Sequence, residues 1–128
     1  MIRILIADDS TLVRRVLRSL IEQDADWKVC GEAVNGGEVL QRALETQPDL
    51  IVLDFQMPVK NGLQVAREIS RVAPSVPVLL CTAHLSSSLI GKAKQAGIHG
   101  AVSKSRAHDI VNGIRALLRH ETFFCQPA

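Results

Sequence analysis

The hydrophobic positions of this chain follow two alternating spacings. Short apolar runs, rich in β-branched residues, predict five strands at residues 2–7, 28–33, 50–53, 76–81 and 100–103. Between these runs, apolar residues recur at i, i+3 and i+4, the spacing that lays one apolar stripe along a helix. The stripes predict helices within residues 12–21, 39–44, 65–69, 86–96 and 110–118. The pattern therefore consists of five strand–helix units.

The predicted strands show little alternation between apolar and polar residues. Strands of this kind suit a parallel sheet that is covered on both faces, because neither face meets water. A strand followed by a helix and a parallel strand is the repeating unit of such sheets. We expect an α/β fold with a doubly wound, five-stranded parallel sheet.

Composition and charge narrow the class of protein. With 128 residues, 47% of them hydrophobic and 22% charged, the chain is an ordinary globular domain in size and balance. A net charge of +2, with dispersed Arg and Lys, does not give the basic surface of a nucleic-acid-binding domain. The densest basic cluster is Arg14, Arg15 and Arg18, which we interpret as the solvated face of the first helix.

The cysteines and the N-terminus indicate where the protein works. Cys30, Cys81 and Cys125 form no CxxC pair, and the first two lie in apolar runs, as small buried residues do. No signal-peptide pattern opens the chain, and no apolar run approaches the roughly 20 residues that span a bilayer. We expect a cytoplasmic protein without a membrane partner.

Polar residues follow four of the five predicted strands. In open parallel sheets, ligands bind beyond the carboxyl ends of the strands. The residues found there are Asp8, Asp9, Asp54, Thr82 and Lys104. The second strand ends in Glu32-Ala33 and contributes nothing obvious to such a site. We expect the other residues to meet at one edge of the sheet.

Three carboxylates at one edge repel one another unless a cation neutralises them. An all-oxygen site with few protein ligands suits Mg²⁺, which binds one or two carboxylates together with phosphate oxygens. Lys104 and Thr82 make sense as an ammonium and a hydroxyl donor to phosphoryl oxygens. This set fits phosphoryl transfer, with Asp54 as nucleophile because it stands alone after a central strand.

Each of these residues also has a purely structural interpretation. Asp9 or Ser10 could simply cap the first helix, and capping is compatible with metal ligation. A single Lys at a strand end is usually a solvated charge, and a single Thr in a strand reflects β-propensity. Four strand ends that supply one consistent set of groups favour the functional interpretation over these separate ones.

At these positions the chain resembles the receiver domain of bacterial two-component response regulators. The resemblance extends from residue 2 to about residue 119. It rests on four motifs: ILIADDS at residues 4–10, VLDFQMPVKNG at 52–62, LCTA at 80–83 and VSKS at 102–105.

The resemblance implies a flavodoxin-like (βα)5 fold with strand order 2-1-3-4-5. It also implies that Asp54 accepts a phosphoryl group from a phosphohistidine on a sensor histidine kinase or phosphotransfer protein. Asp9 is then a direct Mg²⁺ ligand beside Asp54, Asp8 acts largely through water, and the backbone carbonyl of Gln56 completes the protein ligands. A homodimer through a helical face is a further expectation from the family.

In this family Thr82 and Lys104 follow the phosphoryl group and pass its signal to the face formed by the fourth helix, the fifth strand and the fifth helix. Many relatives carry Tyr or Phe three residues before the lysine, where this chain has Ala101, so the usual aromatic rotamer switch is lacking. Gln56 and His84 occupy positions that tune the lifetime of the phosphoryl group in the family.

Residues 29–36 and the tail at 121–127 resemble the subfamily in which a LuxR-type helix-turn-helix domain follows the receiver. We therefore expect a receiver at residues 1–119 and the start of a linker or C-terminal tail at 120–128, with the DNA-binding domain absent from this chain. DNA would be contacted only through that output domain. A truncated transcription regulator and a stand-alone receiver both remain open.

Three other functions fit this sequence less well. A phosphatase of the aspartyl-phosphate type needs a second Asp two residues after the nucleophile, where this chain has Gln56. A flavodoxin-like redox protein needs a loop rich in Gly and hydroxyl residues after the first strand, where Asp8 and Asp9 stand. A scaffold without chemistry has no need of three clustered carboxylates. We expect a phosphoacceptor signalling domain and not a metabolic enzyme.

Overall fold

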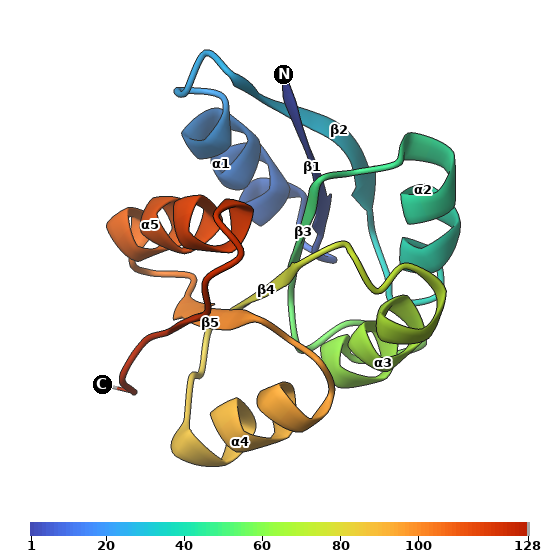
Figure 1. The fold of residues 1–128 in the computed structure, drawn as a ribbon, viewed down its shortest axis with the longest axis vertical. Helices are drawn as coiled ribbons and strands as arrows, with labels where there is room; N and C mark the ends of the chain where they lie inside the picture. Colours follow the sequence, from blue (N-terminus) through green and yellow to red (C-terminus); the bar gives the residue numbers. More distant parts are fainter. Residues whose placement is uncertain (128) are drawn as a thin grey trace.

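The computed structural model describes residues 1–127, so Ala128, the end of the predicted tail, lies outside the described residues. A parallel sheet forms the middle layer, with helices on both of its faces (Figure 1). The strands are β1 (Ile2–Ala7), β2 (Trp27–Ala33), β3 (Leu50–Leu53), β4 (Val78–Thr82), β5 (Gly100–Ser103) and β6 (Phe123–Phe124). The helices are α1 (Thr11–Ile21), α2 (Val39–Thr46), α3 (Gly62–Val72), α4 (Ser87–Gln95) and α5 (Ala107–Leu118).

The sheet has the order β2-β1-β3-β4-β5-β6, with every neighbouring pair parallel. This confirms the predicted α/β class and the order 2-1-3-4-5 of the first five strands. The boundaries of β4 differ from the prediction: it begins at Val78, two residues later than expected, and it includes Thr82. Pro77 has no N–H to donate and contributes only its carbonyl, which accepts from the N–H of Ile51 at 3.0 Å.

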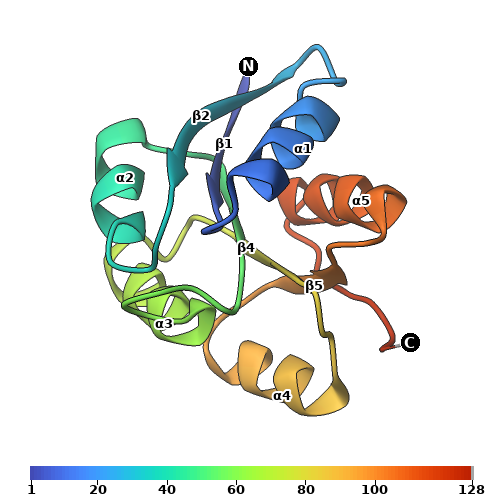
Figure 2. The ribbon, with the colours of Figure 1, turned by 180° about the vertical axis from the view of Figure 1, so that it is seen from behind.

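Helices cover the two faces of the sheet unequally. α1 and α5 lie on one face, and α2, α3 and α4 lie on the other (Figures 1 and 2). Successive residues of β1 alternate between the two cores: Leu5 and Ala7 pack with α2–α4, while Ile4 and Ile6 pack with α1 and α5. All four are at most 1% exposed, which explains why the strand shows no polar alternation.

The sequence pattern does not predict the sixth strand, because the tail has no core periodicity and resembles a linker. Phe123 and Phe124 pair with Gly100 and Ala101 of β5. The N–H of Phe123 donates to the carbonyl of His99 at 3.1 Å. The two rings pack against opposite cores, but two residues are too few to produce a periodic pattern in the sequence. The division into residues 1–119 and 120–128 stays a prediction.

Within residues 1–127, none of the helices has both the length and the apolar character needed to cross a membrane.

Candidate functional site

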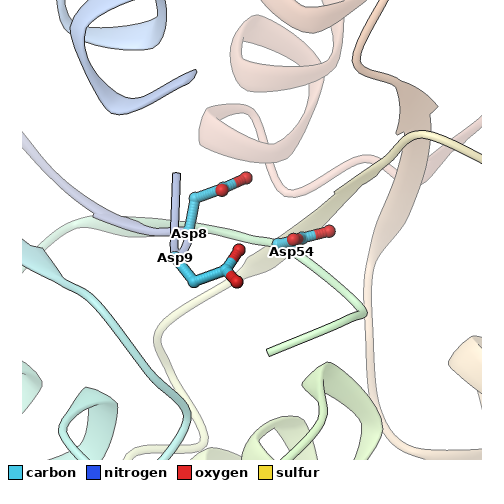
Figure 3. A group of neighbouring side chains, drawn as sticks. All are labelled: Asp8, Asp9 and Asp54. Carbon is cyan, nitrogen blue, oxygen red and sulfur yellow. The ribbon is translucent and has the colours of Figure 1, made fainter. Parts of the chain in front are cut away.

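Asp8, Asp9 and Asp54 meet at the carboxyl ends of β1 and β3 (Figure 3). Each offers a carboxylate oxygen, and these oxygens lie within 4.8 Å of one another. The backbone N–H of Asp54 donates to the carbonyl of Ala7 at 2.9 Å, so the phosphoacceptor predicted from the sequence continues the sheet ladder. Asp8 and Asp54 are buried and Asp9 is exposed. The cluster therefore has two fixed, desolvated carboxylates and one that opens to solvent.

Lys104 supplies the positive charge of this cluster. Its Nζ lies 2.7 Å from Oδ2 of Asp8 and 3.0 Å from Oδ2 of Asp54. Its backbone N–H donates to the carbonyl of Thr82 at 2.9 Å, which joins the ends of β4 and β5. Burial by itself lowers the pKa of Lys104, but the hydrogen bonds to Asp8 and Asp54 outweigh this and hold the pKa above its ordinary value. The side chain therefore stays charged.

One ammonium does not neutralise three carboxylates. Burial raises the pKa of Asp54, the hydrogen bond from Lys104 opposes this rise, and the negative charge of Asp8 adds to it, so that the pKa lies above its ordinary value. A further cation at the cluster would favour the ionised carboxylate. The donors are all oxygens, which suits a hard divalent ion. The acidic cluster could thus hold a metal ion.

Ser10 both starts α1 and orients Asp8. Its Oγ accepts a hydrogen bond from the N–H of Val13 at 3.2 Å, and its own N–H donates to Oδ1 of Asp8 at 2.9 Å. The helix cap is therefore Ser10, which leaves the Asp9 carboxylate available to a ligand.

An open cavity of about 510 Å³ adjoins the acidic cluster. It is lined by Asp9, Phe55, Gln56, Met57, Pro58 and Asn61. Asp9 and Gln56, both expected from the sequence to serve the metal, therefore face one common space. The side chain of Gln56 is exposed to solvent.

The other predicted site residues lie on the side of β4 and β5. Thr82 is the buried last residue of β4, and His84 is exposed two residues further on. His84 lines a second cavity of about 520 Å³ together with Ser103 and residues of the tail. Ala101 is fully buried, with Leu80 opposite it on β4 and Phe124 opposite it on β6. It lies in β5, the strand that leads to Lys104.

Sequence reasoning missed two residues beside the cluster. Glu32, at the end of β2, accepts hydrogen bonds from Arg14 at 2.8 Å and from Arg18 at 2.7 Å. The hydrogen bond from Arg18 lowers the pKa of Glu32 most, burial opposes it, and Arg14 lowers it further. The side chain of Arg14 is only 12% exposed, so the prediction of a solvated face was wrong for this residue. A charged residue near the end of an apolar strand was the available signal.

The fold and the cluster agree with comparisons to known proteins. A family model described as the response regulator receiver domain matches residues 4–115. The transcriptional regulatory protein LnrK of Bacillus subtilis is 37% identical over 111 residues, which is 87% of this chain and 50% of LnrK. The chemotaxis protein CheY of Thermotoga maritima is 32% identical, over 80% of this chain and 84% of CheY.

Solved structures give the same result. A two-component response regulator of the LuxR family from Aurantimonas sp. SI85-9A1 is 34% identical, with a TM-score of 0.91 over 94% of this chain and 87% of that chain. This chain spans 50% to 62% of the length of LnrK and of two further transcriptional regulatory proteins from Bacillus subtilis. Because the family model covers most of the sequence, this chain belongs to the response regulator receiver domain family.

Proposed function

We propose that this chain is a phosphoacceptor signalling domain that receives a phosphoryl group on Asp54. The observation that carries the proposal is the buried Asp54 carboxylate, paired with Lys104 and packed against Asp8. The donor is a phosphohistidine of a sensor histidine kinase or phosphotransfer protein. An oxygen of Asp54 attacks phosphorus, the new O–P bond forms as the N–P bond breaks, and the bonding electrons stay on the imidazole nitrogen.

Mg²⁺ fits the acidic cluster, with Asp8, Asp9, Asp54 and the backbone carbonyl of Gln56 as the residues that would hold it. When bound, the ion supplies positive charge that offsets the negative charge gathering on the phosphoryl oxygens.

Lys104 and Thr82 serve the phosphoryl group on its other side. The Lys104 ammonium already contacts Asp54, so it lies within reach of an oxygen of a group attached to that carboxylate. The hydroxyl of Thr82, at the end of the neighbouring strand, is a suitable donor to a second oxygen. Hydrolysis later returns Asp54: water attacks phosphorus, the O–P bond breaks and inorganic phosphate leaves.

The output of the domain is a change in shape, not the turnover of a metabolite. We place the receiver at residues 1–119 and the start of a linker or tail at 120–128. The relatives named as transcriptional regulatory proteins are longer than this chain, which supports an output through DNA binding by a separate domain. A phosphorylation-dependent homodimer is part of the proposal, and sedimentation of the phosphorylated and unphosphorylated protein tests it.

The first helix offers a surface for the phosphodonor. Leu12 and Val16 are one helical turn apart on α1, and they are 69% and 58% exposed. α1 starts three residues after Asp8, so this apolar ridge lies near the acidic cluster. The sequence pattern assigned both residues to the buried stripe, but only Leu17 and Ile21 of α1 are buried. We propose that Leu12 and Val16 contact the kinase.

The test is the intact mass of the protein after incubation with acetyl phosphate, with and without Mg²⁺. We expect a phosphoryl adduct on the wild type only with Mg²⁺, and none on Asp54→Asn. Asp26→Asn is the matched control, because Asp26 is an exposed carboxylate outside the acidic cluster, and it should be labelled normally. A folded wild-type protein that forms no adduct would favour a scaffold without phosphoryl chemistry.

A further inference from the structure

Arg14 links three segments around the acidic cluster. From α1, its Nη1 donates to the backbone carbonyl of Asp8 at 2.8 Å, and its Nε donates to Oε1 of Glu32 at 2.8 Å. Its Nη2 lies 3.3 Å from Oγ1 of Thr11. The guanidinium thus connects the end of β1, the end of β2 and the first turn of α1. Only a planar fork of several N–H donors can make these bonds together.

The contact with the Asp8 carbonyl bears on Asp9. The Asp8 carboxylate is already held by Lys104 and by the N–H of Ser10. Asp9 is exposed, so its direction depends on the peptide unit that precedes it. The Asp8 carbonyl and the Asp9 N–H belong to one rigid plane. A bond that fixes this carbonyl therefore fixes the plane from which the Asp9 side chain projects.

The charge of Arg14 opposes this positioning effect. A guanidinium near a cation site repels the cation, and Glu32 offsets only part of that charge because it also pairs with Arg18. If Arg14 acted through charge alone, its removal would strengthen cation binding. If it acts by orienting the Asp8–Asp9 peptide, its removal weakens binding. The two effects have opposite signs, so one measurement separates them.

We propose that Arg14 is a positioning residue for the metal site, and that it acts by clamping the Asp8 carbonyl to Glu32 so that the Asp9 carboxylate is presented to the cation. This inference rests on the proposed function of the acidic cluster as a Mg²⁺ site.

Calorimetric titration of the unphosphorylated full chain with Mg²⁺ tests the proposal. Substitutions beside the direct ligands of metals typically cost 10-fold or more in affinity, so we expect Arg14→Met to bind Mg²⁺ about 10-fold more weakly than the wild type. Arg15→Met is the matched control: it removes the same charge from the exposed neighbouring residue. It should bind Mg²⁺ as tightly as the wild type or slightly more tightly. Unchanged or stronger binding by Arg14→Met overturns the proposal.

Arg14→Lys covers the case in which the methionine variant does not fold. Lysine keeps the charge but lacks the fork, so positioning predicts weaker Mg²⁺ binding whereas a charge effect predicts no change. With acetyl phosphate, the variant should need more Mg²⁺ for half-maximal labelling but reach a rate near that of the wild type at saturation. Wild-type Mg²⁺ affinity in a folded Arg14→Lys overturns this inference alone. A wild type that binds no Mg²⁺ overturns the metal site and the inference with it.

Discussion

The ammonium of Lys104 lies 3.0 Å from Oδ2 of Asp54. The same nitrogen contacts Asp8, and the two carboxylate side chains are only 5% and 1% exposed. Lys104 is thus the internal counter-ion of two buried carboxylates that follow different strands. A metal ion at the cluster would share this task, so the effects of Lys104 and of Mg²⁺ on stability should be coupled.

Replacing Lys104 by Met should destabilise the fold by about 3 kcal/mol without Mg²⁺, because it leaves buried carboxylates unpaired. Mg²⁺ should restore part of the lost stability. The gain in the free energy of unfolding on adding Mg²⁺ should be larger for Lys104→Met than for the wild type. Urea unfolding with and without Mg²⁺ measures both quantities. Lys60→Met is the control: it breaks a surface pair with Glu68, which should cost less than about 1 kcal/mol and show no extra dependence on Mg²⁺. Wild-type stability of Lys104→Met would contradict the prediction.

Gly62 lies against the backbone of the phosphoacceptor. A Cβ at this position would come 2.5 Å from the carbonyl oxygen of Asp54 and 3.0 Å from the Cα of Phe55. Gly62→Ala should therefore lower the free energy of unfolding and slow the labelling of Asp54 by acetyl phosphate. Gly91→Ala in α4 is the control, because its Cβ would meet nothing within 4 Å. It should raise stability by about 0.5–1 kcal/mol. The prediction fails if the two variants behave alike.

His99 should make stability depend on pH. Burial lowers its pKa below the ordinary 6.5, and its Nδ1 accepts a hydrogen bond from the N–H of Val78 at 3.2 Å. At pH values between the two pKa values, the folded state binds fewer protons than the unfolded state. The contribution of neutral His99 to the free energy of unfolding is therefore fully present above pH 6.5 and is lost as the pH falls through the lowered pKa. As the pH is lowered from above 6.5 through this pKa, the free energy of unfolding should fall more for the wild type than for His99→Leu. Parallel pH profiles of the two proteins would rule this out.

Phe124 should tie the tail to the sheet. Its half-buried ring packs on the core beside Ala101, and Nζ of Lys94 lies 4.9 Å from the ring centroid. We expect Phe124→Ala to lower the free energy of unfolding by about 1–2 kcal/mol, which is less than the same substitution causes at a fully buried Phe. The amide of Cys125, which donates to the carbonyl of Ala101, should exchange faster with solvent. Lys94→Ala, which removes only the contact of the ammonium with the ring, should lower the free energy of unfolding by about 0.5 kcal/mol. An unchanged Cys125 exchange rate would contradict the prediction.

The exposed ridge on α1 should matter to the kinase and not to a small phosphodonor. A double substitution of Leu12 and Val16 by Ser removes apolar area from a docking surface and should slow phosphotransfer from a sensor kinase about 10-fold. Labelling by acetyl phosphate should be unchanged. Leu44→Ser, a change of similar exposure on α2, should affect neither reaction. Equal slowing of both reactions would point to damage at Asp54 instead.

The sequence by itself determined the class of fold and the membership of the acidic cluster. Hydrophobic spacing is set by local geometry, so the two periods identified five strands and five helices without reference to distant contacts. Asp54 and Lys104 could be placed together because residues that follow parallel strands meet at one edge of the sheet. The order of the strands came from the family resemblance, not from the spacing.

The tertiary structure decided what depends on packing between distant segments. β6 exists because β5 offers an unpaired edge, and two residues carry no period of their own. Arg14 and Glu32 meet because the first strand–helix–strand connection brings α1 over the end of β2. Leu12 belongs to the apolar stripe by spacing but stays exposed, because the side of α1 that packs on the core is formed by Val13, Leu17, Leu20 and Ile21. Periodicity gives the direction of a side chain, whereas the neighbour it finds depends on the whole fold.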